Sequence, residues 1–70
     1  MTRIESPVAG TVVEVHVKTG DRVDKDQHLF VVELGKTLLI VRATIAGVVQ
    51  DVAVKLGDLI QRDSVAVTIK

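Results

Sequence analysis

Residues 9–23 read AGTVVEVHVKTGDRV, and residues 46–60 read AGVVQDVAVKLGDLI. These stretches are two copies of one repeat at an offset of 37 residues, from Gly10 to Gly47, and the match continues to Asp26 and Asp63. Two copies are too few for a solenoid, in which at least about three repeats stack. We therefore expect a closed pair of similar halves related by a pseudo-twofold axis, each half supplying one sheet.

The repeated stretch has the alternation of a β-strand. In residues 13–17, valine alternates with Glu14 and His16, so the three valines are expected to share the buried face. In the second copy, Val52 and Val54 repeat this inward face. Both halves are therefore predicted to begin with a half-buried strand.

Further strands are predicted where β-branched and aliphatic residues run together and no period of 3.6 residues persists. Turns are predicted between them where Gly or Asp favours the backbone conformations that turns require. The chain is therefore expected to be all-β, with helix nearly excluded. The predicted strands are residues 28–33, 38–43 and 65–69, and the predicted turns are residues 18–21, 24–27, 55–58 and 61–64.

Composition excludes several classes of function. Seventy residues make one domain, residues 1–70, too small for a deep catalytic cleft. Nine basic and nine acidic residues cancel, so nothing favours binding to nucleic acid or to an anionic membrane surface. Phe30 is the only aromatic residue, so no base-stacking platform exists.

The absence of cysteine removes disulfides, thiolate chemistry and the usual structural zinc sites. No stretch reaches the roughly 18 apolar residues that a membrane span needs, and the first residues lack the layout of a signal peptide. We expect a soluble cytoplasmic chain with no membrane partner.

Residues 33–37, with the sequence ELGKT, lie between two apolar strand segments and are predicted to form a hairpin tip. Tight turns commonly use glycine, so Gly35 places Lys36 at or beside the apex, in solvent and within reach of a partner. The alternative interpretation is that Lys36 is an ordinary surface lysine that serves only solubility. No activating base stands beside Lys36 in the sequence, so we expect no catalytic turnover.

Other chemistry-bearing patterns are weak. A phosphate-binding loop needs a glycine five residues before Gly35, where Phe30 stands, and a helix after it. His16 and His28 are too far apart in sequence for a local metal motif, so no metal site is predicted. The aspartates in the predicted turns are expected to serve the turns rather than acid–base catalysis.

Three segments resemble the biotinyl/lipoyl-attachment domains, and the likeness covers essentially the whole chain. Residues 6–15 (SPVAGTVVEV) and 17–23 (VKTGDRV) resemble the opening of a biotin carboxyl carrier domain. Residues 29–33 (LFVVE) resemble the strand that leads into the modified lysine.

The spacing around the lysine also resembles that family. A glutamate stands three residues before the family's lysine, as Glu33 does before Lys36. An alanine follows seven residues after the lysine and a glycine eleven residues after it, as Ala43 and Gly47 do. The likeness therefore fixes positions over two turns, a hairpin and the repeat.

The resemblance implies a fold and a function. The fold is a flattened β-barrel or sandwich of two four-stranded antiparallel sheets with pseudo-twofold symmetry, the lysine at a hairpin and both termini at the far end. The function is that of a non-catalytic carrier with biotin attached covalently to Lys36. Gly35, Thr37 and Glu33 are expected to shape the hairpin and contact the ligase. The implied partners are a biotin protein ligase and the biotin carboxylase and carboxyltransferase components of a carboxylase.

The chain departs from the family at the lysine itself. Biotin domains usually have Ala-Met-Lys-Met there and lipoyl domains Asp-Lys-Ala, whereas this chain has Leu34-Gly35-Lys36-Thr37. Two alternatives therefore stay open: a lipoyl carrier of a 2-oxo acid dehydrogenase type complex, and an unmodified structural or binding module. Asp26 and Asp63 replace the usual turn glycines, and aspartate tolerates the left-handed region better than most residues.

Overall fold

The computed structural model describes residues 1–70, which form eight strands and no helix. No helix long and apolar enough to cross a membrane is therefore found. The strands predicted at 28–33, 38–43 and 65–69 are confirmed within one residue. In chain order the strands are β1 (Thr2–Glu5), β2 (Gly10–Val15), β3 (Arg22–Val23), β4 (His28–Leu34), β5 (Thr37–Arg42), β6 (Gly47–Val52), β7 (Leu59–Ile60) and β8 (Val65–Ile69).

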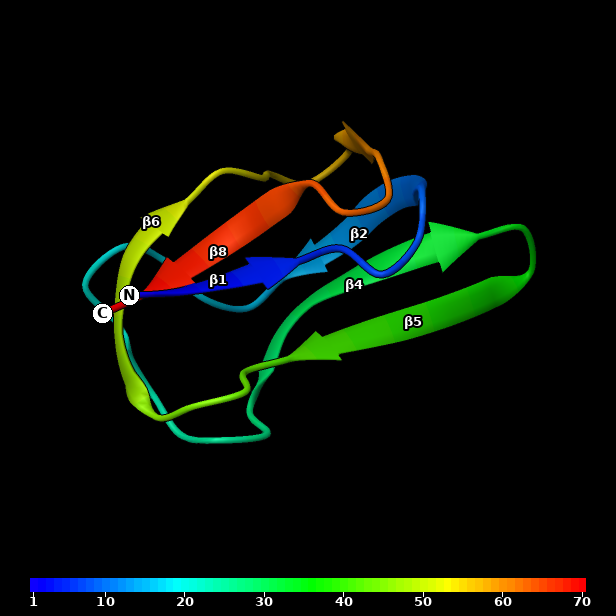
Figure 1. Ribbon diagram of the computed structural model, residues 1–70. Helices are drawn as coiled ribbons and strands as arrows, with labels where there is room; N and C mark the ends of the chain where they lie inside the picture. The colour runs from blue at the N-terminus through cyan, green and yellow to red at the C-terminus, as the bar shows by residue number, and fades with distance from the viewer.

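The strands form two four-stranded antiparallel sheets that do not close into a barrel (Figure 1). One sheet has the order β1-β8-β6-β3 and the other the order β5-β4-β2-β7. The prediction of two four-stranded sheets is confirmed, but the expectation that each half supplies one sheet was wrong. Each half contributes two strands to each sheet, because consecutive strands alternate between the sheets within each half, and only β4 and β5, at the junction of the halves, follow one another in the same sheet.

The two halves contact each other reciprocally. The Val12 N–H donates to the Asp58 carbonyl oxygen at 2.8 Å, and the Val49 N–H donates to the Asp21 carbonyl oxygen at 2.8 Å. The two bonds are related by the repeat: the donors, Val12 and Val49, stand 37 residues apart, and so do the acceptors, Asp21 and Asp58. Reciprocal contacts of this kind are the mark of a twofold relationship. The predicted pseudo-twofold symmetry is therefore confirmed within a single chain.

The space between the two sheets is filled by one apolar core. Phe30 and Leu29 are the largest side chains that solvent cannot reach at all. Burying such side chains supplies most of the stability of a domain this small. The core residues are Ile4, Val12, Val17, Val23, Leu29, Phe30, Val32, Val41, Ala43, Val49, Ile60, Ala66, Val67 and Ile69.

A bulge in β2 corrects one expectation about the core. Val12 pairs with Val32 and Glu14 pairs with Val31, so Val13 is an extra residue with no partner on β4. The bulge shifts the alternation by one position, which buries Val12 completely and leaves Val13 outside the core. The expectation that Val13 faces inward was therefore wrong.

Candidate functional site

Lys36 occupies a two-residue hairpin turn between β4 and β5. Leu34 pairs with Thr37, which leaves only Gly35 and Lys36 in the loop. Gly35 has a φ of 61°, whereas Lys36 has a negative φ. A positive φ at the first central residue alone defines a type II′ turn, which requires glycine at that position. Gly35 therefore fixes the turn that places Lys36 at the apex, as predicted.

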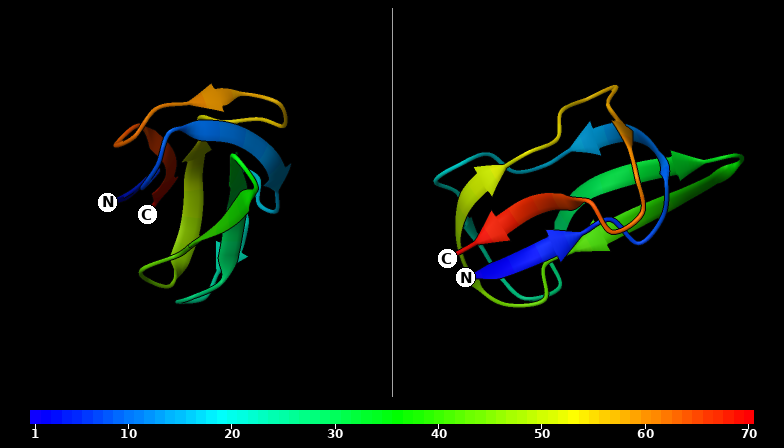
Figure 2. Two further views of the ribbon diagram at one scale, coloured as in Figure 1. Left: turned by 90° about the vertical axis from the view of Figure 1, so that its right-hand side faces the viewer. Right: turned by 45° about the horizontal axis from the view of Figure 1, so that its top comes forward.

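The hairpin carries Lys36 away from the rest of the molecule (Figure 2). The molecule is elongated, with extents of 31 × 18 × 18 Å, and the β4–β5 hairpin extends from one end. Both chain termini lie together at the other end, where Thr2 pairs with Ile69. The arrangement places the lysine at the end of the molecule opposite both termini.

The Lys36 side chain is exposed and takes part in no ion pair. The only close contact between a basic and an acidic side chain joins His16 Nε2 to Glu14 Oε1 at 3.1 Å. A Cβ added to the neighbouring Gly35 would have no atom within 4 Å, so the space around the apex is open. The ε-amine is therefore solvated and accessible to a partner from several directions.

Glu33 and Thr37 flank the turn on its two strands. Glu33 lies on β4 and pairs with Leu38 on one side and Thr11 on the other. Glu33 and Thr37 are both exposed and make no side-chain hydrogen bond. The structure thus brings Glu33, Gly35, Lys36 and Thr37 together on one hairpin, and their contact with a ligase stays a prediction.

Two exposed leucines beside the turn were missed by the sequence interpretation. Leu34 is 49% exposed and Leu38 is 58% exposed, directly before and after the Gly35-Lys36-Thr37 segment. Leu34 was placed in the predicted hairpin tip and Leu38 at the start of a predicted strand, and exposed apolar surface was predicted for neither. The feature of the sequence that could have indicated their exposure is their closeness to the turn, because the tip of a long hairpin projects past the sheet that covers its middle. The lysine is therefore framed by apolar surface.

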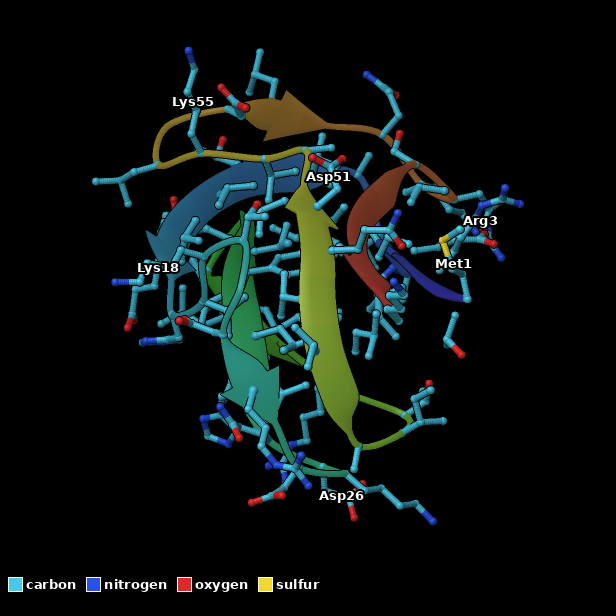
Figure 3. The ribbon with its side chains drawn as sticks, turned by 90° about the vertical axis from the view of Figure 1, so that its left-hand side faces the viewer. Met1, Arg3, Lys18, Asp26, Asp51 and Lys55 are labelled. Atoms are coloured by element: carbon cyan, nitrogen blue, oxygen red, sulfur yellow. The ribbon has the colours of Figure 1, made fainter.

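The other exposed lysines occupy different environments. Lys18 and Lys55 lie in two turns that the repeat makes equivalent, and Figure 3 labels both. The Lys18 N–H donates to Asp21 Oδ2 at 3.0 Å, and the Lys55 N–H donates to Asp58 Oδ2 at 3.1 Å. These lysines serve as matched controls for Lys36 because they are exposed but do not lie in a hairpin turn.

No pocket opens on the surface, and no three His, Cys, Asp or Glu side chains gather as a metal-binding group would require. His16 and His28 are both exposed. The segment after Gly35-Lys36-Thr37 is strand β5, whereas a phosphate-binding loop is followed by a helix. The chemistry that this site offers is that of an accessible primary amine.

Comparison with known proteins agrees with this geometry. The model of the biotin/lipoyl family, described as "Biotin-requiring enzyme", matches residues 2–69. The urea carboxylase of Kluyveromyces lactis contains a region with a TM-score of 0.90 and 25% identity over 99% of this chain. A single-chain, multi-domain long-chain acyl-CoA carboxylase contains a region with a TM-score of 0.86 and 26% identity over 94% of this chain. The chain spans 6% of the length of each carboxylase.

The lipoyl domain of the 2-oxoglutarate dehydrogenase complex from Azotobacter vinelandii has a TM-score of 0.77 and 23% identity. The match covers 96% of this chain and 95% of that domain, and at this identity it shows the fold alone. No curated protein matches the chain. Because the family model spans nearly every residue, the chain belongs to the biotin/lipoyl attachment family, whose domains carry biotin or lipoate on a lysine and are generally not catalytic themselves.

Proposed function

We propose that the chain is a carboxyl carrier whose Lys36 bears biotin and that it serves a biotin-dependent carboxylase. The observation that carries the proposal is the type II′ turn, which holds one unpaired, solvated amine at the end of the molecule opposite the termini. The regions of two carboxylases that share this fold at 25% and 26% identity support biotin as the group.

The residues around the turn fit a covalently tethered group. The surroundings of Gly35 are open, so a ligase can approach without moving the protein backbone. The ε-amine of Lys36 attacks an activated carboxyl carbon, an amide bond forms, the activating group leaves and one proton passes to water. Biotin, once attached, supplies the site at which a carboxyl group is carried from one active centre to another.

The protein's own contribution is tethering. The lysine stem and the hairpin hold the attached group at the end of an elongated domain, and a short flexible link keeps its effective concentration in the range of about millimolar. The stretch from Glu33 to Thr37 is exposed throughout, so a biotin protein ligase, a biotin carboxylase and a carboxyltransferase can each contact it in turn. We assign Glu33, Gly35 and Thr37 to this recognition.

The same geometry serves a lipoyl carrier, which is the second candidate. The lipoyl domain from Azotobacter vinelandii has the same extent as this chain, since each covers at least 95% of the other. Modification of Lys36 by a biotin ligase or by a lipoate ligase distinguishes the two candidates. An unmodified module is the outcome if neither ligase accepts it.

The test is coexpression of the chain with a biotin protein ligase or, in parallel, with a lipoate ligase. Mass spectrometry is expected to find one biotinyl group on the wild type and on Lys18→Arg and Lys55→Arg, and none on Lys36→Arg. Biotin that persists on Lys36→Arg would remove Lys36 as the site. Lipoyl groups in place of biotin would decide for the second candidate.

A further inference from the structure

The edge of the hairpin strand β5 is unpaired. β5 pairs with β4 and with no other strand. Leu34 and Thr37 close the two-residue turn, so the alternation of an antiparallel ladder directs the backbone N–H and C=O groups of Leu38, Ile40 and Arg42 away from β4. None of the backbone hydrogen bonds outside the ladders involves these three residues.

The side chains at this edge are apolar where the symmetry-related edge is charged. Leu38 is 58% exposed and Ile40 is 40% exposed. The equivalent edge strand is β1, where Arg3 stands in the place of Ile40 and Glu5 in the place of Arg42. Arg3 lies on the surface at the opposite end of the molecule (Figure 3). Charged residues on an edge strand prevent pairing with other chains, and β5 lacks this protection at its centre.

We propose that β5 pairs antiparallel with β5 of a second copy of this chain. Leu38 lies opposite the partner's Arg42, and Ile40 lies opposite the partner's Ile40. This register uses all three outward-facing residues of each strand in backbone hydrogen bonds. It joins two four-stranded sheets into one continuous sheet across a twofold axis.

Charge complementarity identifies the second copy as the occupant. Glu33 is the neighbour of Leu38 on β4, so the partner's Arg42 lies two strands away from it on the same face, about 10 Å between backbones. Long arginine and glutamate side chains span that distance above Leu38. Because of the twofold symmetry, the dimer contains two such pairs of Glu33 with the partner's Arg42. The register shifted by two residues instead places Arg42 opposite the partner's Lys36, which sets like charges against each other.

The first test is sedimentation equilibrium of the full chain over a wide concentration range, comparing wild type with Ile40→Lys and Val65→Lys. Val65 is the matched control because it is 39% exposed on β8, in the other sheet. The wild type and Val65→Lys are expected to rise from the 7.5 kDa monomer toward twice that mass, and Ile40→Lys is expected to stay monomeric. A wild type that stays monomeric throughout, or dimers of Ile40→Lys equal to those of wild type, would overturn the proposal.

The second test fixes the register. Glu33→Arg alone and Arg42→Glu alone each create two like-charge pairs, so each is expected to raise the dissociation constant roughly fivefold to tenfold. The double variant Glu33→Arg/Arg42→Glu restores both pairs and is expected to return to the wild-type constant. If the double variant instead shows the sum of the two losses in binding free energy, Glu33 and Arg42 do not meet across the interface.

Discussion

Asp26 and Asp63 stand 37 residues apart and adopt the same left-handed backbone conformation, with φ of 70° and 68°. They are the only residues other than glycine with positive φ. The Asp26 N–H donates to the Ala43 carbonyl and the Asp63 N–H donates to the Ser6 carbonyl, each at 2.8 Å. Each of these bonds joins a turn in one half of the chain to the other half, so the two turns connect the halves symmetrically.

This strained conformation predicts opposite effects of two substitutions. Asp26→Gly is expected to raise the free energy of unfolding by up to about 1 kcal/mol, because glycine adopts positive φ without a steric cost. Asp26→Ala is expected to lower it by about 1 kcal/mol, because alanine enters the left-handed region less readily than aspartate does. Urea denaturation measures both, and an alanine variant as stable as the glycine variant would contradict the assignment.

Gly10 and Gly47 predict unequal effects from equivalent positions. A Cβ at Gly10 would collide with the Glu33 carbonyl oxygen, on a central strand held on both sides. A Cβ at Gly47 would meet the Lys70 carbonyl oxygen at 2.5 Å, and the backbone of Lys70 is hydrogen-bonded to Val48 alone, whereas Glu33 is paired on both sides. We expect Gly10→Ala to cost about 3 kcal/mol and Gly47→Ala about 1 kcal/mol in urea denaturation. Equal costs would show that the backbone at Lys70 is as fixed as that at Glu33.

Phe30 is expected to decide whether the domain folds. Phe30→Ala removes the largest fully buried side chain, at a cost of about 3–5 kcal/mol. A 70-residue domain has a total stability of only about 4–10 kcal/mol, so the variant should be largely unfolded near its working temperature. The control is Leu59→Ala, which truncates a side chain that is 80% exposed and should change stability by less than about 0.5 kcal/mol. Circular dichroism melting curves distinguish the two outcomes, and a well-folded Phe30→Ala would contradict this account of the core.

The sequence predicted the longer strands because each carries enough apolar residues to show its period. Strand β1 has four residues and strands β3 and β7 have two each, too few for a clear alternation, and none of the three was predicted. The side of Val13 was mispredicted because a bulge adds one residue without changing the local composition. Sheet membership was mispredicted because it depends on which distant strands pair, which a local pattern does not contain.

The candidate site, like the fold, could be predicted only in part. Gly35 predicted the turn and therefore the exposure of Lys36, since a two-residue hairpin requires positive φ at a fixed position. The exposed Leu34 and Leu38 depend on how far the hairpin extends past the facing sheet, which only the three-dimensional arrangement reveals. The sequence does not identify a group for Lys36, because residues 34–37 differ from the usual motif of biotin domains and from that of lipoyl domains.

Lys36 is the proposed attachment residue, and the intact mass of the chain purified from its own host tests this most directly. We predict the mass of the polypeptide plus one biotinyl group, with fragmentation placing that group on Lys36. A chain that carries no added mass, or carries the group on another lysine, would contradict the account.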